Sequence, residues 1–463
     1  MRSLSIMDLG FLSTERREMP MHVASLFLFE PPPGAGPEFI RNTYESMLAE
    51  QQFRPPFDDK LDYSLSRLGM PRWVKDEHLD PGYHLRHLAL PAPGRYRELF
   101  SLVSRLHGIL LDRGRPLWEA HLIEGLQDGK FAIYMKVHHG LIDGVGSMRL
   151  VQKSLSGDPD ERGMRFAWSA EIHKGQRSEL PPPPVDRGAM IAAAEVVGAQ
   201  LKTVPGVSRA LLRTAMSARI PRDTRMALPF EAPNSPLNTP VTGARRFVAQ
   251  SYSLERIHAV GKRYGAKVND IVLAMCANAL RRYLDEFAGG VPDKPLVAMV
   301  PVSIRPKDAD AFGNGATSVL VNLGTHIADP IKRFETIRTS MADAKALVQT
   351  MSFNEMMYYT AWMAGPVMVP AMVGLGAIVP SVNVVISNVT GPRTPLYWNG
   401  ARLRGMYPAS ILFHGMALNI TLVSNGGHVD FGIVACRKSL PSIQRFIDFL
   451  EEGLAELERG APA

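Results

Sequence analysis

Hydrophobic residues recur along this chain at two spacings, one typical of strands and one typical of helices. Residues 131–137 alternate in polarity, which is the period of a strand with one face more buried than the other. Residues 22–29 form a continuous apolar run, which suits a buried strand. From residue 269 to residue 287 the apolar positions fall largely on one side of a helix. The pattern therefore predicts a mixture of strands and helices.

The second half of the chain repeats this mixture. Strands are expected over residues 246–252, 296–302, 317–323, 382–386, 417–423 and 429–434, and a closing helix over 442–457. Near the N-terminus, Ser5 followed by Asp8 resembles a helix start. Strands mixed with helices in each half predict two α/β or α+β domains, and they argue against a helix bundle and an all-β sandwich.

A loosely patterned stretch separates the two halves. A chain of 463 residues is too long for one ordinary core, so at least two domains are expected. Charged and proline-rich pieces between residues 157 and 244 flank a basic apolar segment that predicts a helix of its own. We expect an N-terminal domain over residues 1–156, a partly helical linker over 157–244 and a C-terminal domain over 245–463.

One long segment without charged residues, 356–392, first resembles a membrane span. Pro366, Pro370 and Pro380 interrupt it, so it lacks the roughly 20 uninterrupted apolar residues that a spanning helix needs. Two interpretations stay open: a segment of the core, or an apolar surface that takes up acyl chains or rests on a membrane.

Composition places the chain among globular proteins and sets the class of partner. Hydrophobic residues make up 46% and charged residues 21%, which excludes global disorder and a polytopic membrane protein. The formal net charge of +7 favours an anionic partner, such as a phosphate-bearing molecule or an acidic membrane surface. No zinc-finger, aromatic-basic or basic-heptad pattern indicates nucleic acid, so we expect no nucleic-acid binding.

The cysteines and the N-terminus indicate a reducing compartment. Cys276 and Cys436 each lie in an apolar stretch, so we expect buried thiols and neither a disulfide nor a metal framework. Residues 1–12 lack the long apolar core of a secretory signal. The expected location is cytoplasmic.

Residues 138–144, His-His-Gly-Leu-Ile-Asp-Gly, carry the most informative chemistry. They lie between the strand 131–137 and a helical pattern whose first turn Asp143 or Ser147 could cap. A neutral imidazole can accept a hydroxyl proton as the oxygen attacks an activated carbonyl, while a nearby carboxylate fixes geometry or stabilises charge. The predicted reaction class is acyl transfer.

The same residues allow two other interpretations. The histidines and Asp143 could bind zinc, but neighbours on a strand point to opposite faces and no further ligands follow at metal-site spacing. We therefore predict no metal site. Alternatively, both histidines could be structural residues hydrogen-bonded near a turn, and the other motifs of the chain count against this reading.

Four motifs together resemble one family. Residues 138–144 fit the HHxxxDG signature of the bacterial wax ester synthase/diacylglycerol acyltransferases, which belong to the superfamily of chloramphenicol acetyltransferase-like, coenzyme A-dependent enzymes and condensation domains. Pro116-Leu117-Trp118 upstream, Asn269-Asp270 at a helix start and the Ser-Asn-Val-Thr-Gly-Pro of residues 387–392 agree in order and spacing. The resemblance extends from residues 20–23 to the closing helix, and on these motifs the chain is identified as a member.

The resemblance implies a fold and a set of roles. The fold is two chloramphenicol acetyltransferase-like domains with mixed sheets flanked by helices, bounding a tunnel that holds the active site. His139 matches the family's proton acceptor, and His138 would be its supporting neighbour. Asp143 matches a structural or electrostatic aspartate that pairs with an arginine, for which Arg305 is the candidate, and Gly144 forms the turn.

The other motif residues keep two readings each. Residues 116–118 are best read as a rigid turn that buries an indole, against substrate contact. Asn269 could cap its helix or donate a hydrogen bond near the reacting carbonyl. Asp270 is expected to have a structural role. Ser387 and Asn388 could belong to a strand-ending turn, or they could contact the pantetheine arm and the tunnel.

Acyl-CoA is then expected as a co-substrate, with no bound cofactor. The alcohol would attack the thioester directly, since neither cysteine lies in a nucleophile motif and Ser147 lacks the flanking glycines of a nucleophile elbow. The expected acceptor is a long-chain fatty alcohol, giving wax ester, with diacylglycerol second, giving triacylglycerol.

Two alternatives remain. The first is an acyltransferase of the same superfamily with another acceptor. The second is a non-catalytic lipid-binding protein of a lipid droplet or membrane surface, where an acyltransferase could also lie peripherally, at the inner membrane or on lipid inclusions. Acyl-chain preference, the residues that bind the phosphates of coenzyme A and the oligomeric state do not follow from the sequence.

Overall fold

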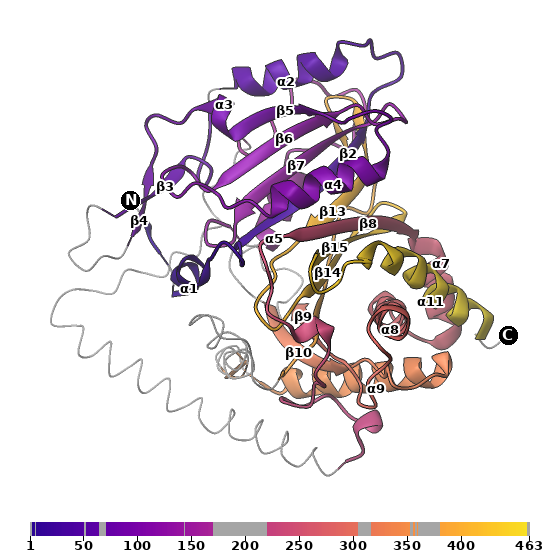
Figure 1. The fold of residues 1–463 in the computed structure, drawn as a ribbon. Helices are drawn as coiled ribbons and strands as arrows, with labels where there is room; N and C mark the ends of the chain where they lie inside the picture. The colour runs from indigo at the N-terminus through magenta and orange to yellow at the C-terminus, as the bar shows by residue number, and fades with distance from the viewer. Residues whose placement is uncertain are drawn as a thin grey trace.

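The computed structural model describes residues 2–4, 6–50, 52–63, 71–142, 144–169, 220–303, 316–351, 355–356, 359 and 380–460. Within these ranges the chain forms two six-stranded sheets flanked by helices (Figure 1). The predicted mixed α/β class is therefore confirmed. The linker segment 170–219 and most of the uncharged segment 356–392 lie outside the described residues, so the predictions for them stay predictions.

The first sheet is built mainly by the N-terminal half. Its strand order is β12-β13-β2-β7-β6-β5, with β5 and β6 parallel and the other neighbours antiparallel. The strands are β2 (His22–Glu30), β5 (Leu85–Ala89), β6 (Trp118–Glu124), β7 (Phe131–His138), β12 (Tyr397–Trp398) and β13 (Ala401–Ala409). Every residue of β7 is buried, which places this strand in the centre of the sheet.

The second sheet comes from the C-terminal half. Its order is β10-β9-β11-β14-β15-β8, and β11 runs parallel to both of its neighbours. The strands are β8 (Arg245–Ser253), β9 (Val297–Ser303), β10 (Ala316–Asn322), β11 (Val384–Val389), β14 (Leu418–Asn425) and β15 (His428–Cys436). All six strands predicted for this half are confirmed, with ends shifted by one to three residues. A small third sheet holds β1 (Arg2–Ser3), β4 (Arg72–Lys75) and β3 (Asp59–Asp62).

Helices cover the sheets. They are α1 (Ile6–Thr14), α2 (Phe39–Ala49), α3 (Pro81–His84), α4 (Tyr96–His107), α5 (Gly144–Lys153), α7 (Leu254–Tyr264), α8 (Val268–Phe287), α9 (Pro330–Gln349) and α11 (Phe446–Gly460), with short 3₁₀ turns η2 (Arg222–Thr224), η3 (Pro236–Asn238) and η4 (Ile443–Arg445). The long helix and the closing helix predicted from periodicity correspond to α8 and α11. Helix α1 begins one residue after Ser5, where the sequence predicted a helix start.

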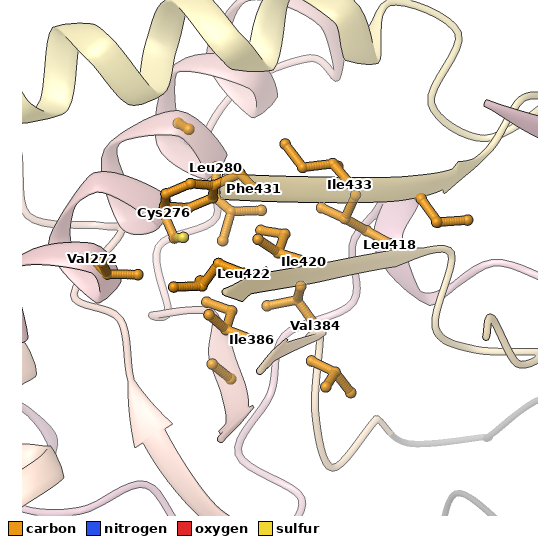
Figure 2. Packing of buried hydrophobic residues seen from close by; sticks show 14 of the residues in the cluster. Val272, Cys276, Leu280, Val384, Ile386, Leu418, Ile420, Leu422, Phe431 and Ile433 are labelled. Carbon is orange, nitrogen blue, oxygen red and sulfur yellow. The ribbon is translucent and has the colours of Figure 1, made fainter. Parts of the chain in front are cut away.

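Helix α8 packs its apolar side against the second sheet. Figure 2 shows Val272, Cys276 and Leu280 of α8 facing the side chains of β14 and β15, among them Leu422 and Phe431. Both cysteines of the chain are buried thiols, as predicted. Burial of this many apolar side chains at about 25 cal/mol per Å² is the main stabilising contribution to this half.

Strand β13 ties the two sheets together. It comes from the second half of the sequence but pairs with β2 of the first sheet, from Arg402 opposite Glu30 to Ala409 opposite Ala24. Its Pro408 carbonyl comes so close to β15 that a Cβ on Gly432 would lie 1.7 Å from the oxygen. Strand β13 thus lies in one sheet and against the other. The domain division at residues 156 and 245 stays a prediction.

The buried Asp430 carboxylate makes the polar contact at this junction. It accepts hydrogen bonds from the Met406 N–H of β13 (2.7 Å), from the Ser251 hydroxyl of β8 (2.6 Å) and from the Asn425 amide (3.0 Å). Burial raises the pKa of Asp430 to about 6. The junction therefore contains a carboxyl group whose charge has to be compensated by three donors.

Candidate active site

The two motif histidines stand at the end of β7, and each backbone N–H is held by a different neighbour. The His138 N–H donates to the Leu117 carbonyl (2.9 Å), and the His139 N–H donates to the Met21 carbonyl (2.8 Å). Both acceptors precede the strands that flank β7, which are β6 and β2. The sheet therefore fixes where the two imidazoles leave the backbone.

His138 is fully buried and both of its ring nitrogens have defined surroundings. The Gly140 N–H donates to Nδ1 at 3.0 Å, so the proton of the neutral ring is on Nε2. Nε2 faces the Glu15 Oε1 at 3.6 Å. Burial, together with the charges of Arg113 and His139, lowers the pKa of His138 to about 3. His138 is therefore neutral at pH 7, with Nδ1 already occupied.

His139 has a different environment. Its side chain is half-buried, and its ring stacks on the Phe11 ring of α1, with centroids 4.2 Å apart and planes at 20°. One histidine is thus enclosed by the fold while its neighbour keeps partial access to the outside. Of the two imidazoles, His139 is the more accessible one.

Glu15 joins this pair to the rest of the N-terminal half. Its carboxylate is almost completely buried and accepts hydrogen bonds from the Met21 N–H (3.1 Å) and from Arg113 through Nε (3.2 Å) and Nη2 (3.0 Å). Arg113 Nη2 also donates to the Leu12 carbonyl (2.6 Å). Met21 therefore accepts from His139 through its carbonyl and donates to Glu15 through its N–H.

The rest of the motif is a tight turn into α5. Leu141 and Ile142 both donate to the His138 carbonyl, at 2.9 and 3.4 Å. Helix α5 begins at Gly144, so Ser147 lies inside the first turn and the prediction that it caps the helix is wrong. Asp143 and Arg305 lie outside the described residues, and their pairing stays a prediction.

Residues 116–118 lie next to the histidine motif and support it. All three are buried, and the Trp118 indole stacks on His84 (4.6 Å between centroids) and Trp168 (5.5 Å). Its Nε1 donates to the Phe57 carbonyl at 2.7 Å. The motif thus places a satisfied indole in the core, while the neighbouring Leu117 carbonyl accepts the His138 N–H.

The Asn269-Asp270 pair starts helix α8. The helix begins at Val268, and the Asp270 carboxylate accepts from the Lys267 N–H at 3.1 Å, so Asp270 closes the first turn. This leaves Asn269 in the second position of the helix, and its predicted capping role is wrong. The Asn269 Nδ2 is buried and has no hydrogen-bond partner among the described residues.

Ser387 and Asn388 lie within β11, which ends at Val389, so the reading of residues 387–392 as a strand-ending turn holds only for residues 390–392. Ser387 is half-buried and pairs with Thr421 of β14, while Asn388 is exposed and pairs with Leu422. The turn begins later, where the Gly391 N–H donates to the Ser424 hydroxyl at 2.9 Å.

The sequence interpretation missed three residues of this site: Phe11, Glu15 and Arg113. Phe11 and Glu15 are four residues apart, the spacing that places side chains on one face of a helix. With the helix start at Ser5 already recognised, this spacing was the available signal. Nothing in the sequence indicated that Arg113, nearly a hundred residues later, would pair with Glu15.

Two negative findings bear on the chemistry. Over the described residues, no group of three or more His, Cys, Asp or Glu side chains could hold a metal ion. In the same part of the chain, no helix is long and apolar enough to cross a membrane.

Comparison with known proteins shows the family. Residues 4–272 match the wax ester synthase/diacylglycerol acyltransferase catalytic domain, and residues 312–458 match the C-terminal domain of the same family. The chain belongs to this family. The wax ester synthase/diacylglycerol acyltransferases are acyltransferases, and membership confirms the enzyme class that the four motifs predicted.

Two relatives and one solved structure of the family align with nearly the whole chain. A probable diacylglycerol O-acyltransferase of Mycobacterium tuberculosis is 46% identical over 454 residues, covering 98% of each chain. The O-acyltransferase WSD of Acinetobacter baylyi is 40% identical and covers 99% of this chain and 97% of its own. The wax ester synthase/diacylglycerol acyltransferase of Marinobacter aquaeolei superposes with a TM-score of 0.77 at 42% identity, covering 99% of both chains.

A more distant structure shares the fold. The starter condensation domain of rhizomide synthetase superposes with a TM-score of 0.54 at 14% identity, over 98% of this chain and 94% of that one. The predicted relation to condensation domains is confirmed at the level of fold.

Proposed function

We propose that this acyltransferase moves a long-chain fatty acyl group from acyl-CoA to the hydroxyl of a lipid alcohol, with His139 as general base. The observation that carries the proposal is the contrast between the two histidines. His138 is buried and neutral, and its Nδ1 accepts from Gly140, whereas His139 is half-buried and supported on one face by Phe11. Family membership supplies the reaction class.

The proposed reaction has one addition and one elimination. The imidazole of His139 accepts the alcohol proton as the oxygen attacks the thioester carbonyl, which forms a tetrahedral oxyanion. The C–S bond then breaks, the ester is released, and the thiolate of coenzyme A takes the proton back from the imidazolium. Both substrates are consumed and no acyl-enzyme forms, so the mechanism needs no nucleophilic side chain and no resident cofactor.

Other motif residues take supporting roles in this proposal. The Asn269 amide keeps a buried N–H available, which suits donation to the developing oxyanion. Ser387 and Asn388 are assigned to the pantetheine arm of the donor. Asp143, paired with Arg305, would hold the turn at Gly144, and the substrates would meet in a tunnel between the two halves.

A fatty alcohol is the proposed first acceptor and diacylglycerol the second. The test measures thiol release from palmitoyl-CoA with hexadecanol or a diacylglycerol, and identifies the lipid product by chromatography. His139→Ala should lower kcat by about two orders of magnitude or more while the protein stays folded. His258→Ala, which removes an exposed histidine on α7, is the matched control and should keep the parent rate.

The outcomes separate the alternatives. Ester formation that disappears in folded His139→Ala and persists in His258→Ala supports the proposal and ranks the acceptors. Thiol release with another acceptor alone would point to a different member of the superfamily. Lipid binding without turnover in the parent protein would point to a non-catalytic lipid-binding protein.

We also propose that the enzyme works at a lipid surface, because both acceptors are insoluble in water. The net charge of +7 favours anionic membranes or inclusions. Sedimentation with vesicles tests this: binding to vesicles with anionic lipid that weakens at high salt is expected, and equal recovery in the supernatant with and without vesicles would contradict it.

A further inference from the structure

We propose that Glu15, held by Arg113, is a positioning residue of the acyl transfer that holds the orientation of His138 and so the place of His139. The inference rests on the proposed role of His139 as general base. It adds an element of the site that none of the four sequence motifs contains.

The contacts of His138 show how Glu15 can orient its ring. Because Gly140 donates to Nδ1, the Nε2–H must point at Glu15, which is the acceptor on that side at 3.6 Å. At this distance the contact is electrostatic, and Nε2 makes no hydrogen bond to any described group. A ring flipped by 180° would direct a carbon towards the Gly140 N–H and leave that buried donor unsatisfied, at a cost of about 1–3 kcal/mol. The Gly140 N–H therefore sets the tautomer, and the Glu15 carboxylate lies on the side to which the Nε2–H points, where it favours the observed ring orientation.

The contacts of Glu15 hold its carboxylate in place and connect it to the backbone of His139. A buried carboxylate is costly unless it is paired, and this one is paired in two directions. Arg113 donates two hydrogen bonds to Oε2, and the Met21 N–H donates to Oε1. Since the Met21 carbonyl accepts from the His139 N–H, the same carboxylate fixes the backbone that carries the catalytic imidazole.

Helix α1 and the residue that follows it support both histidines. Phe11, one turn before Glu15, stacks on His139, and the Glu15 N–H donates to the Phe11 carbonyl at 3.1 Å. One helical turn thus supports both imidazoles, His139 through an aromatic face and His138 through a carboxylate. This arrangement holds the pair in one geometry before a substrate arrives.

The test compares Glu15→Gln with Glu18→Gln, an exposed carboxylate three residues later. Glu15→Gln removes the charge and keeps one oxygen acceptor. The expected result is a loss of kcat of about 10- to 100-fold with KM within about twofold, because substrate binding is untouched while the base is misplaced. Glu18→Gln should match the parent, and Arg113→Lys, which keeps the cation, should recover part of the rate lost in Arg113→Gln.

A double-mutant cycle shows whether Glu15 acts through His138. In a His138→Gln background, Glu15→Gln should lower kcat by clearly less than in the parent background, since the part of its effect that acts through His138 is then absent. Equal losses in both backgrounds, or a parent-like kcat in folded Glu15→Gln, would overturn the proposal. If Glu15→Gln does not fold by circular dichroism, Arg113→Gln takes its place, because it removes the two donors that hold the carboxylate.

A spectroscopic measurement is independent of turnover. In protein with ¹⁵N-labelled histidine, long-range ¹H–¹⁵N spectra distinguish the two imidazole tautomers, and His138→Gln identifies the His138 signals. Both the parent and Glu15→Gln should show the Nε2–H tautomer, because the Gly140 N–H still occupies Nδ1, but the chemical shift of the His138 Nε2–H should change in Glu15→Gln because the carboxylate that faces it is gone. An unchanged Nε2–H shift in Glu15→Gln would contradict the inference. A parent protein that shows this tautomer but transfers no acyl group would instead refute the proposed function.

Discussion

The Phe11 ring lies nearly flat against the His139 imidazole, with the ring centroids 4.2 Å apart. Stacking on one face restricts rotation of the imidazole and covers that face from water.

Loss of this ring should slow catalysis moderately. An aromatic pair contributes about 0.5–1.5 kcal/mol, so Phe11→Ala is expected to lower kcat by about 2- to 10-fold through misplacement of His139. Phe11→Tyr keeps the ring and should stay near the parent. The measurement is steady-state thiol release from palmitoyl-CoA, with Phe287→Ala, at an exposed ring on α8, as control. A parent-like kcat for Phe11→Ala would show that the stack is dispensable.

Gly140 should not tolerate a methyl group. A Cβ there would lie 3.1 Å from the His138 Nδ1 and 3.3 Å from the Asp8 carbonyl oxygen, so a buried ring or a backbone would have to move. We expect Gly140→Ala to reduce stability by about 1–3 kcal/mol and to lower kcat, because the Gly140 N–H bond to His138 is displaced. Thermal unfolding together with thiol release checks both effects, and an unchanged midpoint would show that the turn adapts.

Stability should fall as the pH drops below about 6.5. Burial lowers the pKa of His107 and His138 to about 3 and holds that of His22 well below its usual range. At a pH between these lowered pKa values and 6.5, the three histidines are protonated in the unfolded chain but neutral in the folded one. The stability that is present above pH 6.5 is therefore lost as the pH falls. The expected loss is roughly 1 kcal/mol per histidine for each pH unit.

Melting midpoints at pH 7.5 and pH 5.5 measure this effect, and His107→Gln should show a shallower decline than the parent. Asp430 contributes with the opposite sign, because its pKa is raised to about 6 and its stabilising contribution is lost as the pH rises through that value. Equal pH dependence in His107→Gln and the parent would remove His107 from the explanation.

Gly432→Ala should disrupt the junction between the sheets. Its Cβ would overlap the Pro408 carbonyl oxygen at 1.7 Å, and backbone atoms cannot yield by that amount without moving β13 away from β15. We expect a loss of about 3 kcal/mol or more, or failure to fold. Gly427→Ala, in the adjoining hairpin with no atom within 4 Å of the added Cβ, is the matched control. Comparable melting midpoints for the two variants would contradict this reading of the junction.

Elements with a strong local pattern could be predicted from sequence. Strand β7, helix α8 and the strands of the second half have apolar residues at the period of their own structure. Strand β6 was not predicted, because its buried Glu119 and His121 make it read as polar. In the structure these two side chains pair with each other (3.3 Å), and Glu119 also pairs with Lys136 (3.5 Å), so polar residues are accommodated in the interior.

Some residues of the candidate site could likewise be predicted from the sequence, and others could not. His138 and His139 could be found because they share a short motif with a chemical purpose. Glu15 and Arg113 are joined by tertiary contacts between residues far apart in the chain, and neither carries a local signature. The pairing of β13 with β2 escaped prediction for the same reason, since strand partners separated by more than 370 residues leave no periodic trace.

That pairing also constrains how the protein can be made. During synthesis from the N-terminus, β2 emerges early, but its partner β13 follows only after most of the chain has left the ribosome. Until then the β2 edge offers unpaired backbone groups to other chains. Fragments that end before residue 401 should therefore aggregate, and the two halves are expected to mature together rather than one after the other.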